Sequence, residues 1–200
     1  MILLGCVNNT MGESYIESYK DLFHGTIATN AEAIVDAQKF IPSESGWCGS
    51  GVYFYDSRAK AWWSAKRTCA EAKKSNIKAV PDIVIADINP LNREFILDLR
   101  SSDDLKVFAK FVKELLSEFN FEIEGTMDED EILKYKRELL LSFFCKEKNK
   151  KLIIGYFKQR DQKQIEGLNN FADSWQLAIG IETIYCAKDP NIVSNIRRRS

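Results

Sequence analysis

The residues best able to carry chemistry include a lone histidine and a tyrosine in a glycine-rich segment. His24 is the only histidine in the chain, and Gly25 and Thr26 follow it directly. Tyr53 lies within Gly-Ser-Gly-Val-Tyr-Phe at residues 49–54, where glycines precede an apolar stretch. A lone histidine at the end of a strand is more often structural, and a lone tyrosine on a strand is more often core. Together with the glycines around them, however, His24 and Tyr53 become candidate site residues.

The third chemical group is a single acid near the C-terminus. Glu182 is the only acid in the apolar segment 175–188. In a strand, Ala178, Gly180 and Glu182 would share one face because side chains alternate. Small residues beside an acid leave room for a ligand to approach, which makes Glu182 a candidate site residue.

Hydrophobic periodicity predicts the elements that position these residues. Residues 21–26 read as the strand that carries His24, and residues 52–55 as the strand that carries Tyr53. Thr29 and Glu32 predict a capping box, and Ser57 predicts the cap of the next helix. The remaining expected elements are helices over 29–40, 59–74, 102–119 and 128–146, and strands over 82–88, 95–99, 151–158 and 175–188.

This order of elements predicts the fold class. Strands and helices mix in the first half, a helical pair occupies 102–147, and strands return after it. We therefore expect a single α+β domain over residues 1–200, with a mixed or antiparallel sheet, flanking helices and a helical insertion around 102–147.

Composition and charge exclude several classes. The chain has 200 residues, 45% of them hydrophobic, and a net charge of −1, so it can bury a core but has no global positive field. Any nucleic-acid binding must therefore be local, and no membrane partner is expected. Residues 1–7 are apolar without a basic leader, which favours a buried strand or arm.

The cysteines point to a reducing compartment. Five cysteines are scattered without a CxxC pair, and one histidine provides no metal-ligand cluster. We expect a cytoplasmic protein with free thiols and no metal. Cys48 as a thiol nucleophile is disfavoured because nothing in the spacing supplies a base. Arg197, Arg198 and Arg199 are expected to be solvated.

Three segments together resemble the ADP-ribosyltransferase superfamily. The branch is the one with a His-Tyr-Glu triad, which includes the poly(ADP-ribose) polymerases and the diphtheria-toxin-like enzymes. The matching segments are Leu-Phe-His-Gly-Thr at 22–26, Gly-Ser-Gly-Val-Tyr-Phe at 49–54 and, more loosely, Ala-Lys-Ala-Trp-Trp-Ser-Ala at 59–65. The resemblance implies a split mixed sheet and enzymes that open NAD⁺ at its nicotinamide ribose.

The resemblance also implies a role for each site residue. Gly25, with Thr26 beside it, would hold the nicotinamide carboxamide through its backbone, and His24 would bond a hydroxyl of the adenosine ribose. Tyr53 would pack against the nicotinamide ring. Glu182 would be the catalytic acid, so the catalytic set is Glu182, His24 and Tyr53, with NAD⁺ as the substrate and no metal.

Two positions leave alternatives open. In the family a second aromatic residue stacks on the ring from the following helix, but the matching position here is Ser64. Trp63 is the substitute, with Trp62 as the lesser choice. Asp173 and Glu166 rival Glu182 as the acid.

The chemistry explains why an acid is needed. Loss of nicotinamide leaves an oxocarbenium-like ribosyl cation, and a carboxylate at the ribose opposes that charge. Gly180 stands where arginine-specific relatives carry Glu, so an arginine target is disfavoured. The segment 160–174 would help to select the acceptor in this family.

We therefore expect a cytoplasmic mono-ADP-ribosyltransferase with a macromolecular acceptor. The near-neutral charge favours protein over nucleic acid as that acceptor. The chain's size suggests a bacterial or phage-conflict toxin or effector, with an antitoxin or inhibitor protein as a further partner. An NAD⁺ glycohydrolase with the same site, or a degenerate module that binds ADP-ribose or a partner without turnover, stays open. The serine at position 64 favours the last.

Overall fold

The structure is a computed structural model that describes residues 16–118, 128–158 and 181–198. The described strands are β1 (Ile16–Ile27), β2 (Val52–Tyr55), β3 (Pro81–Asn92), β4 (Ile96–Asp98), β5 (Leu152–Lys158), β6 (Ile181–Ala187) and β7 (Val193–Arg198). The described helices are α1 (Ala28–Ala37), α2 (Arg58–Lys74), α3 (Ser102–Glu118) and α4 (Glu129–Glu147), with short 3₁₀ turns at Arg93–Phe95 and Pro190–Ile192.

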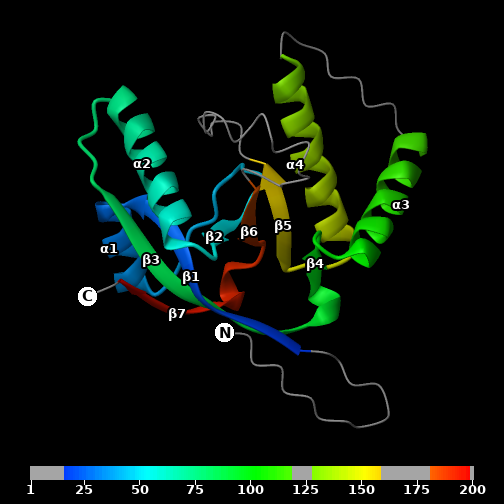
Figure 1. Ribbon diagram of the computed structural model, residues 1–200, viewed down its shortest axis with the longest axis horizontal. Coiled ribbons are helices and arrows are strands. Elements are labelled where there is room, and N and C mark those ends of the chain that lie inside the picture. Colours follow the sequence, from blue (N-terminus) through cyan, green and yellow to red (C-terminus); the bar gives the residue numbers. More distant parts are fainter. Residues whose placement is uncertain (1–15, 119–127, 159–180, 199–200) are drawn as a thin grey trace, which may run out of the picture.

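These strands form one mixed sheet with helices on both faces (Figure 1). The strand order is β4-β5-β6-β2-β1-β3-β7. Strands β4 and β5 are parallel, and every other neighbouring pair is antiparallel. The α+β class with a mixed sheet is therefore confirmed.

Each face of the sheet builds its own core because alternate side chains point to opposite sides. The face covered by α1 buries Leu22, Phe54 and Val84. The opposite face is covered by α2 and α4, which contribute Ala61 and Phe144 to its core. The candidate site residues lie on the central strands, between these two cores.

Strands β1 and β2 are joined at a single position. β1 pairs with β3 along its whole length, from Ile16 to Ile27. With β2 it pairs only where Phe23 lies opposite Tyr55. The sheet therefore has two parts, β4-β5-β6-β2 and β1-β3-β7, that meet at this pair.

The helical pair lies over the β4–β5 end of the sheet (Figure 1). α4 buries Leu141 and Phe144 against the sheet. α3 lies outside α4, and the rings of Phe108 and Phe111 meet the Phe144 ring edge-on at 5.3 and 5.2 Å. The expected helical insertion at 102–147 is confirmed.

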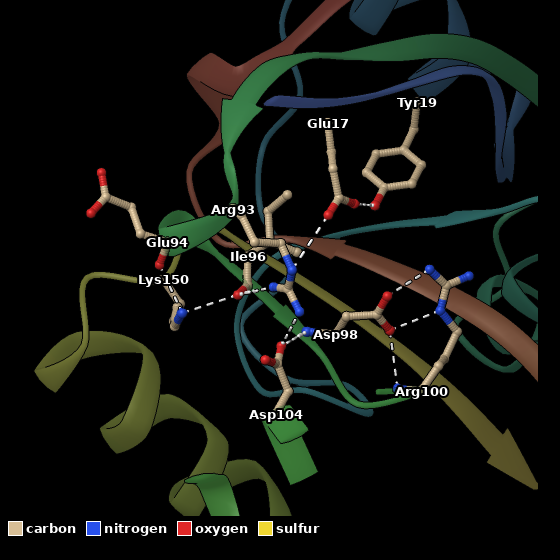
Figure 2. Close-up of polar contacts among 9 residues, drawn as sticks. All are labelled: Glu17, Tyr19, Arg93, Glu94, Ile96, Asp98, Arg100, Asp104 and Lys150. Carbon is tan, nitrogen blue, oxygen red and sulfur yellow. Dashed lines mark hydrogen bonds and ion pairs between the residues drawn. The ribbon is translucent and has the colours of Figure 1, made fainter. Parts of the chain in front are cut away.

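A polar network fixes the start of α3 to β4 (Figure 2). Asp104 accepts a hydrogen bond from Arg93 Nη2 at 2.9 Å and another from the backbone N–H of Asp98 at 2.6 Å. The Asp98 carboxylate in turn accepts two bonds from Arg100, at 2.8 and 2.7 Å. Glu17 approaches Arg93 at 3.4 Å from β1. These charges face one another, so this cluster has a structural role.

The expected capping box is wrong. Helix α1 begins at Ala28, directly after β1, with Ile27 in the cap position and no side-chain cap bond. The Ala28 N–H donates instead to the Val80 carbonyl at 2.8 Å, so a neighbouring backbone replaces the cap that Thr29 was expected to provide. Ser57 does occupy the cap position of α2, but its side chain makes no cap bond.

Two of the C-terminal arginines that were expected to be solvated also make ion pairs, and Arg198 is exposed. Arg197 and Arg198 lie on β7, which pairs with β3. Arg197 pairs with Asp21 and lies 3.7 Å from Asp87, and Arg198 lies 2.5 Å from Asp82. Acids on the neighbouring strands therefore hold these arginines against the edge of the sheet.

Some expectations fall outside the described residues. They concern the N-terminal residues 1–7, the acceptor-selecting segment 160–174 with Glu166 and Asp173, the first part of the strand over 175–188, and Arg199.

Gly25 allows α2 to lie directly on β1. A Cβ atom at position 25 would lie 1.9 Å from the Ala61 carbonyl oxygen and 2.9 Å from the Ala65 nitrogen. Both contacts are with helix backbone, which cannot rotate away as a side chain can. The glycine is therefore required for packing.

We expect Gly25→Ala to lower the free energy of unfolding by about 1–3 kcal/mol, because an added methyl group overpacks this contact. Urea unfolding followed by circular dichroism measures the change. Ser50→Ala, at an exposed position, is the control and should leave the midpoint unchanged. Equal midpoints for Gly25→Ala and the wild type would show that α2 does not rest on β1 as described.

Candidate functional site

Cross-strand pairing places the acid and two tyrosines on one face of the sheet. Tyr53 pairs with Cys186, and Tyr55 pairs with Ile184. Paired residues of antiparallel strands project to the same side, and so do residues two apart on one strand. Tyr53, Tyr55 and Glu182 therefore share the face that α2 covers.

Glu182 is a buried acid, with only 5% of its surface exposed. Its cross-strand partner on β5 is Phe157, whose ring packs against Trp47 at 5.5 Å. A buried carboxylate among aromatic rings is costly unless other groups balance it. Such a position is more typical of a functional acid than of a surface salt bridge.

Tyr55 links this acid to helix α2. Burial raises the pKa of the Tyr55 hydroxyl, a hydrogen bond with Ser64 opposes the rise, and the negative charge of Glu182 adds to it. Only 7% of Tyr55 is exposed. The sequence interpretation did not include Tyr55 in the site, although the alternation of Tyr53 and Tyr55 on one strand was a usable signal.

The Tyr53 hydroxyl is engaged by the loop that precedes β2. It accepts a hydrogen bond from the Cys48 N–H at 3.0 Å and donates one to the Gly49 carbonyl. A Cβ atom at Gly46 would lie 2.6 Å from the Tyr53 ring, so the loop also packs against the phenol end. Burial raises the pKa of Tyr53, which keeps this hydroxyl protonated.

His24 bridges the place where β1 and β2 separate. Its Nδ1 lies 2.8 Å from the Tyr53 carbonyl oxygen. Its ring packs edge-on against Phe40 and Phe54, with centroids 5.1 and 5.9 Å away. The His24 ring therefore lies on the α1 side of the sheet, opposite the face that carries Glu182.

The protonation state of His24 follows from these contacts. A carbonyl oxygen can only accept, so Nδ1 carries the proton and Nε2 is left as an acceptor. Burial lowers the pKa of His24, and the bond to the Tyr53 carbonyl only partly offsets this effect. His24 is therefore neutral at pH 7 and suited to accept a hydrogen bond from a hydroxyl group.

The structure does not place Trp63 beside Tyr53, Tyr55 and Glu182. It lies two residues past Ala61, the buried residue of α2, and so about 200° around the helix axis from the face that meets β1. The Arg67 guanidinium lies 5.5 Å from its ring centroid. Ser64 is the α2 residue that bonds Tyr55.

The predicted site residues thus form two groups. Gly25, Tyr53 and Glu182 share the α2 face, while His24 reaches the Tyr53 backbone from the other side. Thr26, paired with Asp82 of β3, is 5% exposed. That these residues act together on one ligand stays a prediction.

Cys48 has neighbours that do not favour a nucleophile. Its thiol hydrogen-bonds Cys186, and the Lys188 ammonium donates to the Cys48 carbonyl at 3.0 Å. Burial raises the pKa of the Cys48 thiol well above its usual value. The thiol is therefore protonated at neutral pH, and thiolate is the reactive form.

Comparisons with known proteins identify no relative. No family model matches the chain, and neither the curated proteins nor the solved structures contain a match. In the ranges 16–118, 128–158 and 181–198, no three side chains of His, Cys, Asp or Glu are grouped to hold a metal ion. None of the helices in those ranges is long and apolar enough to cross a bilayer.

We expect the pH dependence of stability to report the neutral state of His24. The pKa of His24 is depressed in the folded protein. Below about pH 6.5, His24 therefore binds a proton in the unfolded chain but not in the folded chain. The stability contributed by neutral His24 is therefore present above pH 6.5 and is lost as the pH falls. The free energy of unfolding then falls by up to about 1.4 kcal/mol per pH unit.

His24→Asn removes the only imidazole in the chain while leaving a side-chain donor for the Tyr53 carbonyl. Urea unfolding of both proteins is measured between pH 8 and pH 5. The free energy of unfolding of the wild type should fall relative to that of His24→Asn below about pH 6.5. If the free energies of unfolding of the two proteins changed in parallel with pH, His24 would have the same pKa in the folded and the unfolded state.

Proposed function

We propose that this chain is an NAD⁺-dependent mono-ADP-ribosyltransferase. The observation that supports the proposal best is the adjacency of β1, β2 and β6, which carry His24, Tyr53 and Glu182. Within that arrangement a buried acid lies on the same face as two tyrosines and Gly25. This combination suits a planar aromatic leaving group next to a sugar that becomes positively charged.

The reaction balances without a metal or a redox partner. The bond between ribose C1′ and the nicotinamide nitrogen breaks, and its electron pair stays on the nitrogen, so the pyridinium becomes neutral nicotinamide. The ribosyl carbon is left as an oxocarbenium-like cation. A nucleophile of the acceptor bonds to that carbon and releases its proton to solvent.

The residues of the chain would divide this work. The Glu182 carboxylate would oppose the charge that develops on the ribose, and its burial would strengthen that effect. The nicotinamide ring would lie on the Tyr53 side, near the Gly25 backbone. His24 Nε2 would accept a hydrogen bond from a hydroxyl of the adenosine ribose. The dinucleotide would thus span the separation between β1 and β2.

One observation favours a second candidate, a module that binds ADP-ribose without turnover. Ser64 supplies no ring, and Tyr55 reaches the space beside it. The Tyr53 hydroxyl is committed to the loop at Cys48 and Gly49. An NAD⁺ glycohydrolase uses the same residues and differs only in accepting water.

We also propose a cytoplasmic location and an effector or toxin role, with an antitoxin or inhibitor protein as a possible partner class. The location is supported by Cys48, Cys69, Cys145 and Cys186, which are free and buried in the described parts of the chain. Free thiols persist in a reducing compartment.

Glu182→Gln tests the catalytic assignment. It keeps the shape of the side chain and removes the charge, so NAD⁺ consumption should fall about 10²–10³-fold. Nicotinamide release, followed by chromatography, measures the rate. Binding of NAD⁺ by calorimetry should be nearly unchanged, because the acid acts on charge that appears only during the reaction.

Three variants serve as controls. Asp189→Asn removes an acid outside the site, and Asp173→Asn and Glu166→Gln remove the rival acids. A loss confined to one rival would move the catalytic role to that residue. If the wild type binds NAD⁺ but consumes it no faster than Glu182→Gln, the binding module is correct. Labelled NAD⁺ in a cell lysate separates transfer, which labels macromolecules, from hydrolysis, which yields free ADP-ribose.

A further inference from the structure

Helix α2 carries a concentration of positive charge that the net charge of the chain conceals. It contains six Lys or Arg residues and one acid. α1 has two acids and no base, α3 has three lysines and four acids, and α4 has four bases and five acids. A chain with a net charge of −1 therefore presents one strongly basic helix.

The charge lies on the solvent side of the helix. α2 buries Ala61, Ala65 and Cys69 against the sheet. Arg58, Trp62, Lys66 and Lys73 are spaced by four and seven residues, so they line one side of the helix, here called its outer side. This side flanks the buried stripe of Ala61, Ala65 and Cys69, and all four residues are exposed. The C-terminal end of the helix extends beyond the sheet (Figure 1).

One aromatic ring, that of Trp62, lies among these cations, and a second ring, that of Trp63, lies beside another cation of the same helix. Trp62 keeps 39% of its surface exposed, so part of its ring is accessible to a ligand. Lys66 Nζ lies 6.0 Å from the Trp62 ring centroid, and Arg67 lies 5.5 Å from that of Trp63. Cations that track a phosphate backbone beside rings on which bases stack are the features of single-strand binding surfaces.

We propose that the outer side of α2, defined by Arg58, Trp62, Lys66 and Lys73, binds single-stranded nucleic acid. The proposal that this strand is also the ADP-ribose acceptor rests on the proposed function. Both surfaces involve α2, because the inner side of this helix packs on β1 at Gly25, next to the strand that carries Tyr53 and Tyr55. Net charge alone had favoured a protein acceptor, whereas the local distribution of charge favours nucleic acid.

Two other anionic partners fit less well. A membrane-surface helix inserts a continuous apolar face into the bilayer, but the apolar residues Ala61, Ala65 and Cys69 of α2 are already buried against the sheet. An acidic protein would use the cations but would leave the exposed Trp62 ring without a stacking partner.

The test is fluorescence anisotropy of labelled oligo(dT) and oligo(rU), about 12 nucleotides long, a length within the site sizes of single-strand binding proteins. Affinity should fall steeply with salt as counterions are released. Lys66→Glu with Lys73→Glu should weaken binding at least tenfold and reduce the salt slope. Trp62→Ala should weaken it about tenfold, and Trp62→Phe should restore most of the loss.

Lys106→Glu with Lys110→Glu on α3 is the matched control. It makes the same charge change at lysines whose side chains are each 77% exposed, and it should change binding less than twofold. Equal weakening by both double variants would show a net-charge effect and overturn the proposal. So would absence of binding by the wild type, or binding of polyglutamate that Trp62→Ala does not affect, which would assign the surface to acidic proteins.

Oligonucleotide binding is measured without NAD⁺. The proposed enzyme activity and the proposed nucleic-acid surface can therefore be disproved independently. If the wild type does not consume NAD⁺ while the oligonucleotide binds as expected, only the proposed function is wrong. If the oligonucleotide is not bound but Glu182→Gln abolishes turnover, only the acceptor surface is wrong.

Discussion

Helix α2 can rest on strand β1 only because residue 25 has no side chain, and both surfaces proposed above depend on this contact. The helix backbone at Ala61 occupies the position that a Cβ atom would need. This depth of packing carries Ser64 to the Tyr55 hydroxyl and turns Trp62 outward. One glycine thereby sets the inner and the outer faces of the same helix.

Hydrogen bonding then ties the candidate site to the backbone of β2. The Tyr53 carbonyl accepts from His24, and the Tyr53 hydroxyl bonds the Cys48–Gly49 loop. The pairing of β2 with β6 places Glu182 on the same face. The acid, the tyrosine and the histidine are therefore related through one short strand, although their side chains lie on two sides of the sheet.

Local patterns predicted the helices well and the tertiary contacts poorly. The apolar repeat of residues 102–119 matches α3 (Ser102–Glu118) because an amphipathic helix is encoded by its own spacing. β7 was missed because its arginines are neutralised by acids on other strands. His24 and Tyr53 were correctly placed on strands, whereas the contact of Tyr55 with Ser64 depends on how deeply α2 packs. A summed charge near zero did not show the local excess of six bases over one acid in α2.

The single pairing of Phe23 with Tyr55 has a mechanical consequence. Separating β1 from β3 would break a ladder that runs from Ile16 to Ile27, but within the sheet, parting β1 from β2 breaks one rung and the imidazole bond beside it. Within the sheet, the two parts are therefore joined by less backbone pairing than either part has within itself. The bond of His24 to the Tyr53 carbonyl adds a second link across this boundary.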